Sequence, residues 1–174
     1  MKKVLIISYF FPPCNLTASQ RVFSWAKYLN KFGYRPVILT RRWDNTINSL
    51  ADISKETPSE ILFESNENYE VYYLPYRPNL RDRIYVKFGE HKYSFFRRLL
   101  TFSELLFQNI FTVAIPYNHL FSYAEQLIKK DAAIKKVIIS GNPFNTFKIG
   151  FSLNKKFAIH WIADYRDAWT TSEI

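Results

Sequence analysis

The fold is decided by residues 4–40, which read VLIISYFFPPCNLTASQRVFSWAKYLNKFGYRPVILT. The run that starts at Val4 is continuously apolar, which is typical of a parallel strand covered on both faces. Apolar residues then recur at helical spacing over residues 20–32, and Gly33 follows at the place where a left-handed residue ends a helix. A second apolar run at residues 36–40 completes a strand–helix–strand unit, for which a right-handed crossover is expected.

The rest of the chain continues this alternation. Further strands are predicted at residues 70–74, 137–140 and 159–163, and further helices at 95–110, 117–130 and 144–155. Residues 41–68 are polar and rich in Asn, Ser and Glu, so we expect a mobile loop there with at most a short helix. The pattern indicates the α/β class, with a single Rossmann-like, doubly wound parallel sheet of five strands in the order 3-2-1-4-5. The length of 174 residues fits one domain, which we place at 1–174.

Composition narrows the class of protein further. The chain is 48% apolar and 18% aromatic, which is enough to bury a core and argues against disorder. With Cys14 as the one cysteine and three scattered histidines, we expect no disulfide, no metal, no cofactor and a reducing cytoplasm. We interpret the short apolar run near the N-terminus as a buried strand rather than a signal peptide, and we see no run of the roughly 18 apolar residues that a transmembrane helix needs.

Candidate site residues follow the predicted strands, because ligands of such sheets bind beyond the carboxyl ends of the strands. The first loop, residues 10–19, leads into the start of a helix, where free N–H groups and the helix dipole favour an anion such as a diphosphate. The alternative is an ordinary turn that prolines stiffen. The phosphate-loop candidates are Pro13, Asn15, Thr17 and Arg21. GxGxxG and GxxxxGK[ST] do not occur, which disfavours a dinucleotide or P-loop site.

The segment after the last predicted strand, Asp164-Tyr165-Arg166-Asp167, places two carboxylates around one guanidinium. In a functional interpretation, Asp164 orients a ligand hydroxyl as the catalytic residue, while Arg166 holds a negatively charged group. The alternative is a structural Arg–Asp pair that fixes the loop, a role we expect mainly of Asp167. Asn142, which follows another predicted strand, is a further ligand-binding candidate. We expect His160, which lies within the predicted strand, to be a core or edge histidine rather than a base.

Two segments resemble the amino-terminal part of GT-B glycosyltransferases of family 4, in particular a bacterial subgroup. The first, FFPPCNLTASQRVFSWAKYLNKFGYRPVILT at residues 10–40, has a PPxN loop and a WxKYL helix. The second, VIISGNPFNTFKIGFSLNKKFAIHWIADYRDAW at residues 137–169, has a small-polar turn before a helix and a D-[FYL]-R-D-x-W ending. They occur in the same order as in the family. Many members carry a Gly-Gly pair where this chain has Asn15-Leu16.

The resemblance implies a two-lobed enzyme of the hexosyltransferase class that acts in polysaccharide biosynthesis. The first lobe holds a glycan or lipid-linked acceptor, and the second binds the nucleotide-sugar donor and carries an E-x7-E signature. We expect the donor-binding lobe to be absent from this chain and the isolated domain to be inactive. The one E-x7-E spacing, from Glu56 to Glu64, falls in the polar loop with Pro58 inside it and is interpreted as coincidence. The resemblance also implies that Asp164 is the catalytic residue and that the first loop meets the diphosphate of the donor. The acceptor-binding candidates are then Asn142, Arg166 and Asp167.

Residues 77–98 form a basic and aromatic stretch. Seven basic residues and two acidic ones, Asp82 and Glu90, give this stretch five of the chain's nine net positive charges. The basic residues are Arg77, Arg81, Arg83, Lys87, Lys92, Arg97 and Arg98. The aromatic residues interleaved with them are Tyr85, Phe88, Tyr93, Phe95 and Phe96. A predicted helix that overlaps the end of the stretch carries one apolar stripe, consisting of Phe95, Leu99, Phe102, Leu106 and Ile110.

Three interpretations of the basic stretch are open. It forms a surface for anionic phospholipids, which suits an enzyme with a lipid-linked acceptor on the inner face of the membrane. It forms a solvated basic face over an aromatic stripe that points into the core. A nucleic-acid surface is the third, but the chain has no RNP-type or helix-turn-helix signature, so we expect no nucleic-acid partner. The competing function is a non-catalytic Rossmann-like binding module, or a subunit of a split enzyme, that docks on a membrane or a partner.

Overall fold

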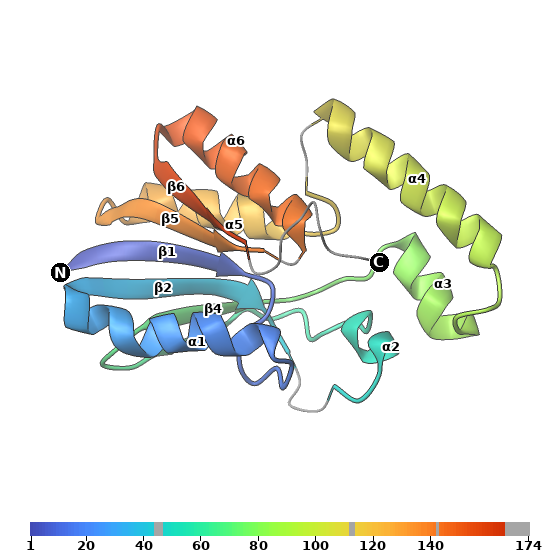
Figure 1. Ribbon diagram of the computed structural model, residues 1–174, viewed down its shortest axis with the longest axis horizontal. Coiled ribbons are helices and arrows are strands. Elements are labelled where there is room, and N and C mark those ends of the chain that lie inside the picture. The colour runs from blue at the N-terminus through green and yellow to red at the C-terminus, as the bar shows by residue number, and fades with distance from the viewer. Residues whose placement is uncertain (44–46, 112–113, 142, 166–174) are drawn as a thin grey trace.

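The computed structural model describes residues 1–43, 47–111, 114–141 and 143–165. Its centre is one six-stranded sheet in the order β3-β4-β2-β1-β5-β6 (Figure 1). The strands are β1 Lys2–Ser8, β2 Tyr34–Arg41, β3 Leu62–Ser65, β4 Glu70–Leu74, β5 Ile134–Ser140 and β6 His160–Asp164. All neighbouring strands are parallel except β3, which pairs antiparallel with β4 at the edge. The predicted α/β class and the order of the five parallel strands are confirmed.

Helices cover both faces of the sheet. The elements are α1 Ala18–Tyr28 with a 3-10 turn at Leu29–Phe32, α2 Leu50–Ile53, α3 Leu80–Phe88, α4 Ser94–Phe111, α5 Asn118–Lys130 and α6 Phe147–Phe157 with a 3-10 turn at Phe144–Thr146. Alternate residues of β1 point to opposite faces: Leu5 and Ile7 pack with residues of α5 and α6, whereas Val4 and Ile6 pack with residues of α1. This explains why the strand is apolar at successive positions.

The predicted loop at residues 41–68 contains more structure than expected. Besides the short helix α2, it includes β3, whose four residues are all exposed. Phe63 of β3 packs against Tyr72 of β4 with ring centroids 4.7 Å apart. A short strand that is exposed at the sheet edge shows no buried apolar run or alternation, so its sequence pattern gave no signal.

Gly150 marks the packing of α6 on β6. A Cβ built at this position would stand 2.3 Å from Cε3 of Trp161, so a side chain here must displace the indole ring. We expect Gly150→Ala to lower the free energy of unfolding by about 2 kcal/mol, because overpacking costs up to about 3 kcal/mol and the gain in helix propensity is about 1 kcal/mol. Denaturant unfolding of Gly150→Ala checks this, with Ser152→Ala on the same helix as the control. Equal stability of Gly150→Ala and the wild type would contradict the packing.

The helices α3 and α4 form a hairpin that stands away from the sheet. Figure 1 shows it at the end of the molecule toward which the strand arrows point. The predicted helix at residues 95–110 is confirmed within α4, and its apolar stripe is exposed. The aromatic residues Phe88, Tyr93, Phe95 and Phe96 of the basic stretch are exposed too, so the interpretation in which its aromatic stripe points into the core is wrong. Within the described residues, no helix combines the length and apolar character needed to cross a membrane.

Candidate functional site

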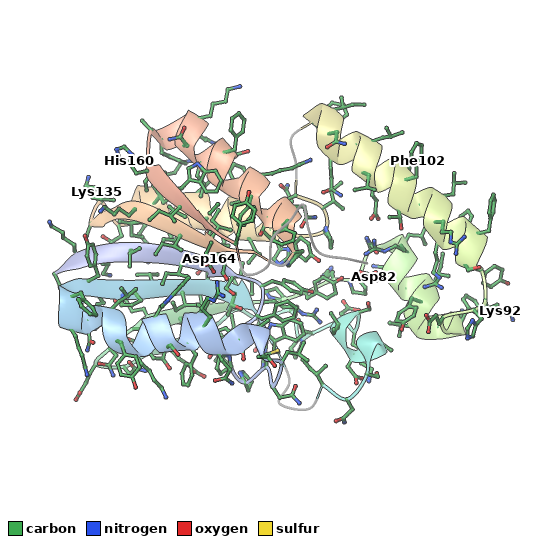
Figure 2. All side chains as sticks on the ribbon, in the orientation of Figure 1. Asp82, Lys92, Phe102, Lys135, His160 and Asp164 are labelled. Atoms are coloured by element: carbon green, nitrogen blue, oxygen red, sulfur yellow. The ribbon has the colours of Figure 1, made fainter. Side chains whose placement is uncertain are left out.

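The carboxyl ends of three adjacent strands bring Ser8, Ser140 and Asp164 together. Ser8 pairs with Ser140 in the ladder between β1 and β5, and Ser140 pairs with Asp164 in the ladder between β5 and β6. Ser140 Oγ donates a hydrogen bond to Asp164 Oδ2 at 3.0 Å. The backbone N–H of Gly141 donates to the carbonyl oxygen of Asp164 at 2.8 Å. Figure 2 labels Asp164 at this edge of the sheet.

Arg21 crosses from α1 to the same carboxylate. Its Nη1 lies 2.8 Å from Asp164 Oδ1, so a residue of the first segment contacts the end of the last strand across 143 positions of sequence. The sequence predicted that these segments meet at one edge, and this contact confirms it. The Arg21 side chain is 41% exposed and that of Asp164 is 16% exposed. Solvent therefore screens the ion pair, which limits its contribution to stability.

The geometry fixes the Asp164 carboxylate and leaves it accessible. Among the described residues, Arg21 donates to its Oδ1 and Ser140 to its Oδ2. A carboxylate offers about four lone-pair sites, so both oxygens keep acceptor capacity for a ligand hydroxyl. Arg21 in turn exposes part of its guanidinium beside the carboxylate, where it can meet an anion.

The first loop supplies the start of α1. Thr17 is the N-cap residue, and its side chain makes no cap hydrogen bond. The side-chain amide of Asn15 donates to the carbonyl of Ile47 at 3.2 Å, so this candidate ties the loop to a neighbouring segment. Pro13 and Thr17 are exposed, and the first turn of α1 contains no acidic residue. The positive end of the helix dipole is therefore not offset by a carboxylate of its own first turn.

Sequence reasoning missed Ser19, which holds this loop in place. Ser19 is buried, and its hydroxyl lies 2.9 Å from the carbonyl oxygen of Cys14 and 2.8 Å from that of Leu16. A small polar residue near a helix start was the available signal. Burial raises the pKa of the Cys14 thiol, which disfavours the reactive thiolate.

Several predicted residues lie elsewhere. Asn142, Arg166 and Asp167 fall outside the described residues, so their roles stay predictions. His160 is exposed at the first position of the edge strand β6, at the opposite end from Asp164, which confirms the expected edge position (Figure 2). Within the described part of the chain, no three or more His, Cys, Asp or Glu side chains are grouped to hold a metal ion.

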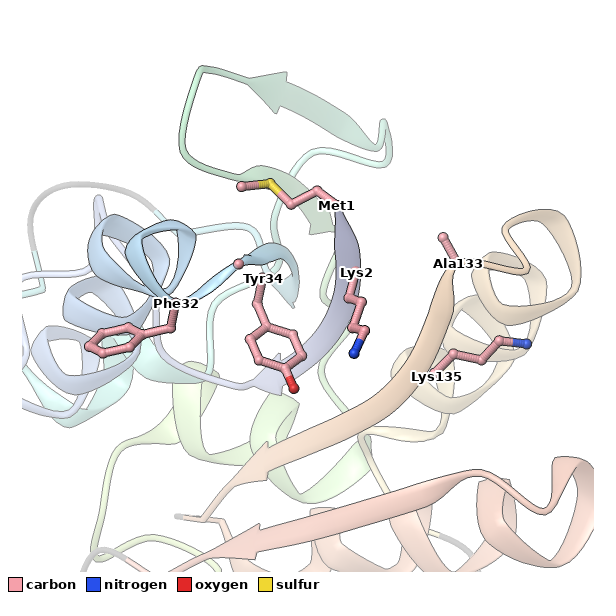
Figure 3. Close-up of a pocket in the computed structure, with 7 residues that line it drawn as sticks. Met1, Lys2, Phe32, Tyr34, Ala133 and Lys135 are labelled. Carbon is pink, nitrogen blue, oxygen red and sulfur yellow. The ribbon is translucent and has the colours of Figure 1, made fainter.

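A hollow of about 660 Å³ lies at the amino ends of the strands (Figure 3). Its lining residues are Met1, Lys2, Phe32, Gly33, Tyr34, Ala133 and Lys135. Lys2 and Tyr34 begin β1 and β2, so this hollow is at the opposite end of the sheet from Asp164. Because ligands of doubly wound sheets bind at the carboxyl ends, we do not assign it as the site despite its size.

A second polar centre, which the sequence did not reveal, surrounds Arg41 at the carboxyl end of β2. Arg41 is 1% exposed, and its guanidinium carbon lies 3.9 Å from the ring centroid of Tyr76 and 4.2 Å from that of Trp43. Its Nη2 donates to the carbonyl of Lys55 at 2.9 Å, and its Nη1 bonds the hydroxyl of Tyr9. Burial raises the pKa of Tyr9 to about 12, so this hydroxyl stays protonated at neutral pH. The buried cation is thus held by aromatic faces and oxygen atoms.

The Arg41 centre is linked to the helical hairpin. The hydroxyl of Tyr76 donates to Asp82 Oδ2 at 2.6 Å, and Arg81 Nη2 donates to Asp82 Oδ1 at 3.0 Å. Asn79 caps α3 by accepting from the backbone N–H of Asp82, and its amide donates to Glu104 of α4 at 2.7 Å. Desolvation raises the pKa of the Glu104 carboxyl, and the charge of nearby Arg81 opposes that shift. This network fixes α3 and α4 to the carboxyl end of the sheet, which also carries the candidate site.

Two comparisons with known proteins found no relative. No family model matches the chain. No curated protein matches it either.

Proposed function

We propose that this chain is the acceptor-side domain of a GT-B glycosyltransferase, which moves a sugar from a nucleotide-sugar donor to a glycan or lipid-linked acceptor. The observation that carries the proposal is the contact between Arg21 and Asp164 at 2.8 Å. It joins the two segments that resemble family 4, and it does so where doubly wound sheets bind ligands. A functional pair is favoured over a purely structural one because both partners remain partly exposed.

Each residue of the edge has a defined task in this proposal. Asp164 accepts a hydrogen bond from the acceptor hydroxyl and takes its proton as the oxygen attacks the anomeric carbon of the donor. The bond from that carbon to the diphosphate breaks, and its electron pair stays on the leaving phosphate oxygen. Arg21 and the exposed start of α1 face the growing negative charge, which they stabilise electrostatically. Ser140 keeps the Asp164 carboxylate in position.

Donor binding depends in this proposal on a second lobe. We therefore expect this chain alone to bind UDP- and GDP-sugars weakly or not at all, because the family resemblance assigns most donor contacts to that lobe. Isothermal titration calorimetry on residues 1–174 measures this. Micromolar affinity of the chain alone would show that the donor site has been misplaced.

One observation favours the second candidate function, a binding module that docks on a membrane or a partner. The outward face of α4 is apolar over most of its length. Docking is compatible with the enzyme proposal, since an enzyme with a lipid-linked acceptor works at a membrane. A protein that joins this chain to the proposed second lobe separates the two functions, because only the enzyme releases nucleotide diphosphate from a donor in the presence of acceptor.

A further inference from the structure

The helix α4 is turned with its polar side inward and its apolar side outward. Phe95 is 81% exposed and Ile110 is 71% exposed. The other large apolar side chains exposed on this helix are Phe96, Leu99, Phe102, Leu105, Leu106, Phe107 and Phe111. The one buried residue of α4 is the polar Gln108. A helix that only covered the protein core would have the opposite arrangement.

Hydrogen bonds to the body of the protein fix this orientation. Lys148 Nζ of α6 donates to the carbonyl of Gln108 at 2.8 Å, and the amide of Asn145 donates to Gln108 Oε1 at 3.2 Å. Glu104, on the same side of the helix, accepts from Asn79 at 2.7 Å. Because the inward side already has polar partners, rotating α4 to bury its apolar side would break these bonds and leave polar groups without partners.

Exposed basic side chains lie on the same hairpin as the apolar face. Of the seven basic residues in the stretch, Arg81 pairs with Asp82 and Arg97 turns inward to the carbonyl of Glu90 and the ring of Tyr85. The exposed ones are Arg77, Arg83, Lys87, Lys92 and Arg98. Among the acidic residues of the hairpin, Asp82 is buried, Glu104 is half-buried and Glu90 is exposed. The accessible charge of the hairpin is therefore predominantly positive. Figure 2 shows Lys92 at its tip and Phe102 on α4.

The chemistry of this face selects its partner. Aromatic and leucine side chains on one face, flanked by exposed Lys and Arg, are characteristic of helices that lie in the interface of an anionic bilayer. A second copy fits less well, because the chain carries nine net positive charges and a symmetric contact would bring equal basic rims together. The helix has 18 residues, but it is not apolar enough to span a bilayer, so a position in the plane of the membrane is the one that fits.

We propose that α4 lies flat in the headgroup region of an anionic membrane, with its outward side chains at the acyl boundary and the exposed basic residues on lipid phosphates. The inference stands on α3 and α4 alone and does not require the enzymatic proposal. It has a consequence for the site, because the hairpin lies beyond the carboxyl ends of the strands, which is the end of the sheet that carries Asp164 (Figures 1 and 2). Docking through α4 would place the membrane on this side of the sheet.

Co-sedimentation with vesicles tests the proposal on residues 1–174. We expect binding to phosphatidylcholine vesicles that contain phosphatidylglycerol, weak binding to phosphatidylcholine alone, and release by salt because screening weakens charge attraction. The double variant Leu99→Gln, Phe102→Gln should lower the partition coefficient roughly 100-fold or more, since burying two such side chains drives insertion. Lys87→Gln with Lys92→Gln should lower it roughly 20- to 30-fold.

A matched control is Phe32→Gln, which removes an aromatic side chain that is 75% exposed at the opposite end of the sheet. It should bind as the wild type does. Insertion is measured separately with the variants Phe102→Trp and Phe32→Trp. Lipids with brominated acyl chains should quench the fluorescence of the introduced tryptophan in Phe102→Trp but not in Phe32→Trp. Circular dichroism establishes that each variant is folded.

Three results would overturn the proposal. Equal binding of the wild type to neutral and anionic vesicles, or no binding to either, contradicts a basic membrane surface. Loss of binding in Phe32→Gln to the same degree as in the α4 variant contradicts the assignment to α4. Self-association in solution that the α4 variant abolishes, without vesicle binding, would assign the face to a second copy of the chain.

Discussion

In the two-lobed enzyme that we propose, replacing Asp164 with Asn is expected to lower the turnover of sugar transfer by about 10²-fold or more. The amide keeps the size of the carboxylate: its one oxygen can accept from Arg21, and its NH2 group can donate to the Ser140 hydroxyl oxygen. It cannot take the proton of an acceptor hydroxyl. Loss of a positioned acid–base group has this magnitude. Initial rates at saturating donor and acceptor measure the effect.

The same substitution should leave the fold intact. The pair with Arg21 is partly exposed, so its loss is expected to cost about 1 kcal/mol or less. A matched control is Asp131→Asn, because Asp131 Oδ2 also lies 2.8 Å from a cation, Lys3 Nζ, but at the amino end of the sheet. Full activity of Asp164→Asn together with an early melting transition would show that Asp164 is a structural residue.

Replacing Asp82 with Ala should have the largest effect on stability. Asp82 is buried and accepts hydrogen bonds from Tyr76 and Arg81, so its removal leaves a hydroxyl and a half-buried guanidinium without their partner. Breaking such a pair costs roughly 3–5 kcal/mol, and the lower end applies here because Arg81 is partly exposed. At about 2–4 °C per kcal/mol, Tm should fall by on the order of 10 °C.

Thermal melts of Asp82→Ala and Glu60→Ala check this prediction. Glu60 is an exposed carboxylate in the loop before β3, so its replacement should leave Tm nearly unchanged. Equal melting of the two variants would mean that the contacts among Tyr76, Arg81 and Asp82 do not fix the hairpin to the sheet.

The elements that could be predicted from the sequence are those whose buried residues recur at a regular spacing. The apolar runs of β1 and β2 and the helical spacing of α1 gave the fold because each buries a regular face. Gly33 ends the first helical segment with φ of 79°, as its position predicted. The edge strand β3 was missed because an exposed strand of four residues carries no such pattern.

The site was predictable in position but not in contacts. Because ligands bind beyond the carboxyl ends of the strands, the first loop and Asp164 could be predicted to lie at the same end of the sheet. Which side chains meet there depends on how α1 crosses the sheet, so only the structure identifies Arg21 as the partner of Asp164. The direction of the α4 stripe was equally hidden, since periodicity shows that a helix has an apolar face but not what covers it.

The most direct test of the central claim is whether a protein that joins this chain to the proposed donor-binding lobe transfers sugar at all. Labelled UDP- and GDP-sugars are incubated with this protein and host membranes, and label is measured in the lipid and glycan fractions. The proposal predicts label in one of these fractions with the wild type and with Asp131→Asn, and at least about 10²-fold slower labelling with Asp164→Asn. Labelling by Asp164→Asn at the wild-type rate, or no labelling from any donor by the folded wild type, would contradict it.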